Sequence, residues 1–151
     1  MSLNDDIALL TAVPLFHGLD REQLRLIAFG AEHRRVPAGE VLFQERAPAE
    51  SAYIVASGQL ELSKVGRDGL KHVEAIVGTG TLLSELALAT MVERKFTAVA
   101  LEDTDVIRIT RALFHRLIEE YPDMARTVEN RIRDSIAALA QQATALQHRF
   151  S

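Results

Sequence analysis

The sequence predicts a mainly β fold, in which an antiparallel barrel of short strands lies between two N-terminal helices and a long C-terminal helix. Between about residues 34 and 110, short runs of β-branched or alternating apolar residues are separated by turns that contain glycine. Many short strands at such spacing are typical of a barrel or a sandwich. On both sides of this region, apolar residues recur every three or four positions, as they do in amphipathic helices.

The first thirty residues contain signals for two short helices. Apolar residues from Ile7 to Val13 recur at helical spacing, and Pro14 closes this pattern. A second helix is expected to begin at Asp20, because Gln23 three residues later completes a capping box. We interpret both helices as packing elements.

Six segments of the central region have the composition of strands. A hairpin is expected between residues 59–63 and 72–77, because Asp68 and Gly69 lie between them and glycine tolerates the positive φ that tight turns demand. The expected strands are residues 40–44, 51–55, 59–63, 72–77, 96–101 and 105–109.

After the strands, the helical pattern returns. Thr110 is expected to cap a helix that ends at Tyr121, and Pro122 opens a second helix that meets no helix breaker before Phe150. We therefore divide the chain into residues 1–121, which contain the first helices and the barrel, and residues 122–151, which form the long helix.

The long helix carries a heptad seam of apolar residues. A helix of nearly thirty residues, at about 1.5 Å per residue, is longer than a small barrel. This length favours a homodimer in which two copies of the helix pair, and the alternative is an amphipathic helix that lies along its own barrel. The seam residues, spaced 4, 3, 4, 3 and 4 apart, are Ile132, Ile136, Leu139, Ala143, Leu146 and Phe150.

The composition of the chain excludes several classes of protein. A length of 151 residues predicts one domain, and a net charge of −4 disfavours binding to nucleic acid. The absence of cysteine excludes disulfides and thiolate chemistry. No apolar stretch is long enough to span a membrane, and the acidic N-terminus lacks the features of a secretory signal, so we expect a cytoplasmic protein. No catalytic triad, carboxylate pair, metal-ligand spacing or triphosphate-binding loop is visible, so we expect no enzyme, metal site or required cofactor.

Three segments resemble one known family. Residues 9–28, "LLTAVPLFHGLDREQLRLIA", are similar to its opening helices, and residues 37–62, with Gly39 and Gly58, are similar to its first strands. Residues 114–124, "FHRLIEEYPDM", are similar to the helical segment that follows its barrel. The family is the cyclic nucleotide-binding domain family, which includes bacterial catabolite activators and the regulatory subunits of cyclic-AMP-dependent kinase. Over about residues 9 to 140, the resemblance implies a jelly-roll barrel, also called a double-stranded β-helix, that binds a cyclic nucleotide.

Residues 79–100 resemble the phosphate-binding cassette of this family. The family pattern G-E-x-A-L is matched by residues 84–88, and the pattern R-x-A-T by residues 94–97. The resemblance implies that Glu85, beside Ser84, accepts a hydrogen bond from the ribose 2′-hydroxyl, and that Arg94 pairs with the exocyclic phosphate oxygens. The other contacts implied are Leu86, Ala87, Lys95 and Thr97 for the phosphate, and Leu139 and Ala140 for the base.

The chemistry of these residue types fits the phosphate ester of a sugar. A short helix that begins just after Glu85 presents free N–H groups and a positive dipole end to an anion, and Arg94 adds charge-assisted hydrogen bonds. Because a carboxylate repels a free phosphate, the pair indicates a ligand with a sugar hydroxyl between phosphate and carboxylate. The alternative is that Glu85 and Arg94 form an ion pair with each other in an empty cassette.

Two functions remain open at this point. In the first, the protein is a stand-alone sensor that binds cyclic AMP or cyclic GMP and signals to a partner protein through the C-terminal helix. In the second, it is a degenerate scaffold for dimerisation or protein interaction that binds no nucleotide. Ser84 favours the second function because the family commonly has glycine there and a Cβ disfavours a positive φ. Phe96 favours it because a small residue is usual beside the phosphate. Direct DNA binding is not expected, since the C-terminal helices carry nearly balanced charges.

Overall fold

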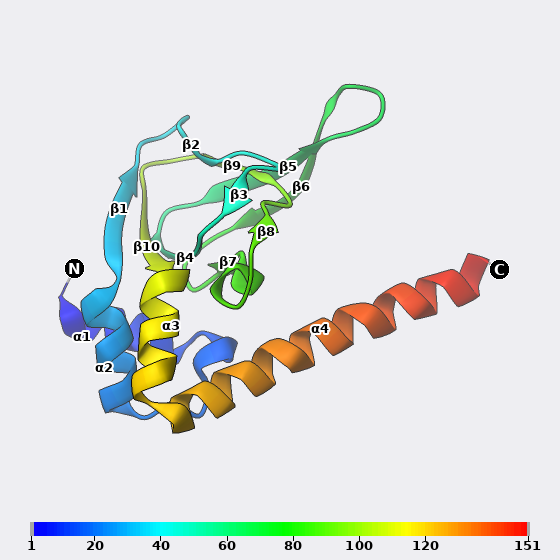
Figure 1. The fold of residues 1–151 in the computed structure, drawn as a ribbon. Coiled ribbons are helices and arrows are strands. Elements are labelled where there is room, and N and C mark those ends of the chain that lie inside the picture. The colour runs from blue at the N-terminus through cyan, green and yellow to red at the C-terminus, as the bar shows by residue number, and fades with distance from the viewer. Residues whose placement is uncertain (1, 151) are drawn as a thin grey trace.

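The structure is a computed structural model that describes the backbone of residues 2–150 and the side chains of residues 2–138. Helices surround one end of a barrel of strands (Figure 1). In chain order the elements are α1 (Leu3–Thr11), the 3₁₀ helix η1 (Pro14–Phe16), α2 (Arg21–Gly30), β1 (Glu32–Val36), β2 (Val41–Phe43), β3 (Pro48–Ala49), β4 (Ser51–Ser57), β5 (Leu60–Val65), β6 (Lys71–Val77), β7 (Leu82–Leu83), the 3₁₀ helix η2 (Glu85–Leu88), β8 (Val92–Glu93), β9 (Thr97–Ala100), β10 (Thr104–Thr110), α3 (Arg111–Glu120) and α4 (Pro122–Phe150).

The predicted fold class is confirmed. Two four-stranded antiparallel sheets, in the orders β1-β10-β4-β7 and β2-β9-β5-β6, form the jelly-roll barrel, and β3 pairs with β8 beside it. All six predicted strands are present, and β5 and β6 form the hairpin expected around Gly69. The sequence analysis does not predict β1, β3, β7 or β8.

The helices begin largely where their capping residues predict. The Asp20 carboxylate accepts a hydrogen bond from the Gln23 N–H at 2.8 Å, and the Gln23 side chain accepts one from the Asp20 N–H at 3.0 Å. Thr110 caps α3 by accepting from the Leu113 N–H at 3.1 Å. The first helix is shorter than predicted and ends at Thr11, because the residue before Pro14 is extended, as residues before proline usually are.

The sheet β1-β10-β4-β7 has an apolar core on each of its two faces. Ile54 of β4 packs with α1, α2, α3 and the start of α4, whereas Tyr53 and Val55 of the same strand point into the barrel. Strand β4 is therefore buried on both faces, which explains its continuous run of apolar and small residues.

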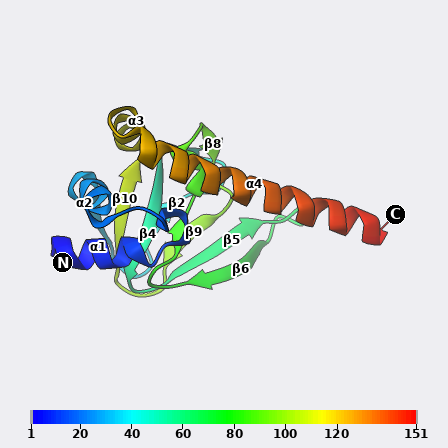
Figure 2. The same cartoon turned by 90° about the horizontal axis from the view of Figure 1, so that it is seen from below.

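Among the side chains that the structure describes, helix α4 packs on the domain over its first half. Its buried residues are Met124, Ala125, Val128 and Ile132, and they contact α3 and the helical core. Ile136, the next residue of the predicted seam, is 50% exposed. Figures 1 and 2 both show the helix continuing beyond the barrel in one direction. The seam residues from Leu139 onward lie outside the described side chains, so the homodimer stays a prediction. Among the described residues, no helix is both long and apolar enough to cross a membrane.

Candidate functional site

The predicted cassette is the segment from β7 through η2 to β8. The fully buried Ala87 and Leu88 anchor η2, and Leu88 belongs to the core shared with the N-terminal helices. On the far side, Val92 pairs with Ala49 of β3. Strand β7, which precedes η2, pairs with β4, so the short helix is fixed at both ends.

Ser84 adopts a left-handed backbone conformation. Its φ of 63° and ψ of 44° lie in the left-handed region. The Cβ of Ser84 disfavours this geometry without preventing it, since serine there carries strain of roughly 1 kcal/mol. Ser84 therefore adopts the positive φ that its Cβ disfavours, in a strained turn.

A cavity of about 290 Å³ opens beside η2. It brings together five residues singled out from the sequence: Ser84, Glu85, Leu86, Lys95 and Phe96. Its remaining lining residues are Phe43, Leu82, Leu83, Val92 and Glu93. The cavity therefore contains most of the predicted cassette, and the Phe96 side chain forms part of its wall.

Three predicted phosphate contacts do not line this cavity: Arg94, described below, and Ala87 and Thr97. The Ala87 N–H donates to the Ser84 carbonyl at 3.0 Å, inside η2, and the Ala87 side chain is fully buried. The Thr97 hydroxyl accepts the Glu45 N–H at 3.0 Å. Both groups therefore hold the local backbone together in this structure. Leu139 and Ala140, the predicted base contacts, lie outside the described side chains.

Glu85 lies between the cassette and the long helix. Burial raises the pKa of its carboxyl, and a hydrogen bond from the Ser135 hydroxyl, at 3.4 Å, opposes part of this rise. Glu85 also lines a second cavity, of about 550 Å³, between η1 and α4. The sequence analysis missed Ser135. The available signal was that Ser135 is a hydroxyl residue one helical turn before Leu139, the predicted base contact.

Arg94 is held by neutral groups. It is 6% exposed, and its guanidinium donates to the Ser51 carbonyl at 2.7 Å and to the Ser51 hydroxyl at 3.3 Å. Its Cζ lies 4.7 Å from the ring centroid of Phe43 and 5.2 Å from that of Tyr53. No described carboxylate forms an ion pair with it, so the expected alternative of a Glu85–Arg94 pair is not observed.

The electrostatic surroundings of Arg94 are unfavourable to its charge. Burial lowers the pKa of the guanidinium; Tyr53 opposes this, the positive charge of Arg108 adds to it, and Glu50 offsets part of the effect. A buried cation with only neutral partners is uncommon, since buried charges are usually paired. Arg94 would therefore be stabilised by a bound anion.

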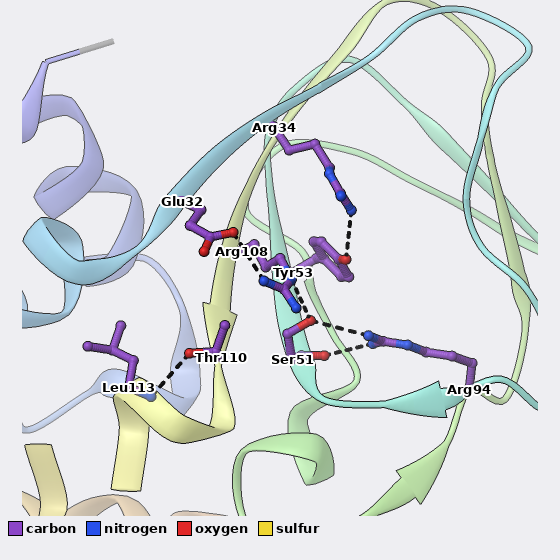
Figure 3. A network of polar contacts seen from close by, with 8 residues as sticks. All are labelled: Glu32, Arg34, Ser51, Tyr53, Arg94, Arg108, Thr110 and Leu113. Atoms are coloured by element: carbon purple, nitrogen blue, oxygen red, sulfur yellow. Dashed lines mark hydrogen bonds and ion pairs between the residues drawn. The ribbon is translucent and has the colours of Figure 1, made fainter. Parts of the chain in front are cut away.

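The Ser51 hydroxyl connects Arg94 with Arg108, and separately a third arginine bonds to Tyr53 of the same strand (Figure 3). Arg108 donates to the same Ser51 hydroxyl at 3.1 Å, and its other end pairs with Glu32. Arg34 donates to the Tyr53 hydroxyl at 3.2 Å. Sequence reasoning missed this network because Ser51 and Tyr53 occur in a run that reads as a buried strand. The one signal was that Ser51 and Tyr53 alternate with the apolar Ala52 and Ile54, so that the two polar residues share one face of the strand.

Comparison with known proteins identifies the domain. Residues 33–121 match the model of the cyclic nucleotide-binding domain. The chain is 32% identical over 126 residues to the cyclic AMP receptor protein of Thermus thermophilus, covering 81% of this chain and 58% of that protein. It is 33% identical over 133 residues to a lysophospholipase of Chaetomium globosum, covering 88% of this chain but 9% of the enzyme. The chain thus spans well under two thirds of these relatives' lengths.

A solved structure agrees with this result. The cyclic nucleotide-binding-like protein of Brucella abortus is 43% identical, superposes with a TM-score of 0.70, and is covered over 98% of its length by 76% of this chain. The family model, the two relatives and the Brucella structure all match the part of the chain that contains the barrel and the cassette. This chain belongs to the cyclic nucleotide-binding domain family.

Proposed function

We propose that the protein is a regulatory sensor, without catalytic activity, that binds cyclic AMP or cyclic GMP in the cavity beside η2. The observation that carries the proposal is the state of Arg94, a buried cation with no carboxylate partner, next to a cavity lined by Ser84, Glu85 and Leu86. A cyclic phosphate supplies the missing negative charge. The name of the Thermus relative, a cyclic AMP receptor protein, supports the same class of ligand.

Each part of a cyclic nucleotide has a counterpart in the site. Glu85 is the acceptor for the ribose 2′-hydroxyl, and a hydroxyl donor suits it because burial already disfavours its charged form. Arg94, which lies next to the cavity, is the phosphate partner, and Leu86 and Lys95 line the cavity itself. The apolar wall of Phe43, Leu83 and Phe96 leaves room for the sugar or the base.

Helix α4 is the element that transmits binding. Ser135 of this helix contacts Glu85, so a ribose hydroxyl that engages Glu85 competes with the hydrogen bond that links cassette and helix. A ligand shifts the helix only by its different affinity for the two helix positions. The signal then passes to a partner protein in the cytoplasm through a homodimer built on the seam from Ile132 to Phe150.

A scaffold that binds no nucleotide is the second candidate. Phe96 favours this candidate, because its side chain lines the cavity and limits the space for a ligand. Arg94 favours it too, because its guanidinium bonds to Ser51, which does not line the cavity. In this case the barrel serves dimerisation or protein interaction.

Calorimetric titration with cyclic AMP and cyclic GMP separates the two candidates. Wild-type protein is compared with Arg94→Ala and with Arg116→Ala, a control that removes an exposed arginine of α3. We expect micromolar binding in wild type and control and its loss in Arg94→Ala. If neither nucleotide produces heat or thermal stabilisation in the wild type, the sensor is refuted and the scaffold is supported.

A further inference from the structure

Arg94 does not line the cavity to which its function assigns it. The residues on both sides of it, Glu93 and Lys95, line the cavity, and so does Phe43. The guanidinium instead lies over the Phe43 ring. It reaches Ser51 on β4, as Figure 3 shows. Phe43 therefore contacts the Arg94 guanidinium and also lines the cavity. To contact a phosphate in the cavity, Arg94 must leave Ser51 and move past this ring.

The charge balance of the cavity makes this movement necessary. Glu85, Glu93 and Lys95 are its ionisable lining residues, so without Arg94 two carboxylates face one ammonium group. An anionic ligand is repelled by such a surface. Once Arg94 turns in, the positive and negative charges are equal, and a phosphate gains a bidentate partner.

The groups that hold Arg94 are all neutral. Two hydrogen bonds to Ser51 and two aromatic faces stabilise the guanidinium, and each contact is modest by itself. Arg108 donates to the same hydroxyl from the other side, at 3.1 Å, so two like charges share one acceptor. A carboxylate in place of Ser51 would bind Arg94 far more firmly.

We propose that Ser51, with Phe43 and Tyr53, forms a latch that holds Arg94 outside the cavity and thereby sets the affinity for nucleotide. The proposal rests on the proposed function, since it describes the regulation of the same site. Ligand binds only the fraction of molecules in which Arg94 is released, so the apparent dissociation constant equals the intrinsic constant divided by that fraction. Ser51 acts as a positioning residue, because it does not line the cavity.

The test is the substitution Ser51→Ala, which cannot change a contact with the ligand. It removes the 3.3 Å bond to Arg94 together with the 3.1 Å bond to Arg108, and it leaves the 2.7 Å bond from Arg94 to the backbone carbonyl. We expect binding of cyclic AMP or cyclic GMP to become about three- to tenfold tighter, since one charge-assisted hydrogen bond of the closed latch is lost. Ser57→Ala, the same change at the other end of β4, is the control and leaves affinity unchanged. Equal or weaker binding in folded Ser51→Ala overturns the latch.

A second measurement examines the latch without nucleotide. In the NMR spectrum of the free protein, the Arg94 side-chain Nε–H resonance is expected to be shifted by the two aromatic rings and protected from exchange. In Ser51→Ala it moves toward the resonance of Arg116, an exposed arginine. If Arg94 already resembles Arg116 in the wild type, the latch does not exist. If no variant binds either nucleotide, the proposed function fails, and this spectrum alone decides whether Arg94 is held by Ser51.

Discussion

Replacement of Phe96 by alanine tests whether the cavity is limited by its own wall. The Phe96 ring is partly buried, lines the cavity and packs against the barrel core, and the Lys64 ammonium lies 5.0 Å from its centroid. Phe96→Ala removes the ring while the backbone of β9 next to it remains paired. The change therefore affects cavity size and local packing but leaves the cassette in place.

The expected cost in stability is moderate. Truncation of a fully buried phenylalanine costs about 3–5 kcal/mol. Phe96 is only partly buried, and the space left by its ring opens onto an existing cavity, so the packing loss is about 1–2 kcal/mol. Loss of the contact with Lys64 adds about 0.5 kcal/mol, because it is exposed to solvent. We expect the free energy of unfolding to fall by about 2 kcal/mol in urea titrations.

The expected effect on binding has the opposite sign. A volume of about 290 Å³ lies just below the range of about 300–1,000 Å³ that is usual for small-molecule sites. Without the ring the cavity enters this range, and we expect nucleotide to bind about tenfold more tightly in calorimetric titrations, equivalent to about 1.4 kcal/mol.

The control for Phe96→Ala is Phe29→Ala, which removes a ring that is 83% exposed on α2. It is expected to change neither stability nor binding. If folded Phe96→Ala binds nucleotide no better than the wild type, Phe96 is not the obstacle and the reasoning from cavity size is wrong.

Three further predictions concern the strained turn, the buried carboxyl and the long helix. Ser84→Gly is expected to raise the free energy of unfolding by up to about 1 kcal/mol, because glycine adopts the left-handed conformation without strain; a loss of stability in urea titrations contradicts this. Burial raises the pKa of Glu85, so the folded state holds the carboxyl proton more tightly than the unfolded state does. The stability that the Glu85 carboxyl contributes is therefore present at acidic pH and is lost as pH rises through the folded-state pKa. Glu85→Gln should therefore gain stability relative to the wild type as pH rises above the ordinary pKa of a glutamate carboxyl, and parallel urea profiles refute the assignment. Truncation after Gln141 is expected to give a monomer by light scattering, and a truncated dimer would place the interface elsewhere.

Local signals in the sequence predicted the elements whose boundaries depend on local chemistry. The caps at Asp20 and Thr110 and the hairpin at Gly69 are determined by residues a few positions apart. Strand β1 was missed because four of its five residues are polar. It lies at the edge of its sheet, paired with β10 only, and an edge strand does not need alternating apolar residues.

The position of Arg94 shows where sequence reasoning stops. Its residue type and its place in the cassette pattern could be read from the chain. Its contact is with Ser51, forty-three positions away, and it depends on how β4 and β8 meet in space. No spacing rule links two such residues. The same holds for Ser135 and Glu85, which are brought together only by the angle at which α4 leaves α3.

Helix α4 extends well beyond Ile132, its last buried residue among the described side chains, and this length gives it the mechanical properties of a lever. Ile132 is buried, and the helix continues from there to Phe150, a span of about 27 Å at about 1.5 Å per residue. A tilt of about 10° at Ile132 therefore displaces the far end by about 5 Å. Ser135, which contacts Glu85, lies within one turn of this pivot. A change of less than 1 Å at the cassette thus becomes several ångströms at the tip, which is the size of a side chain.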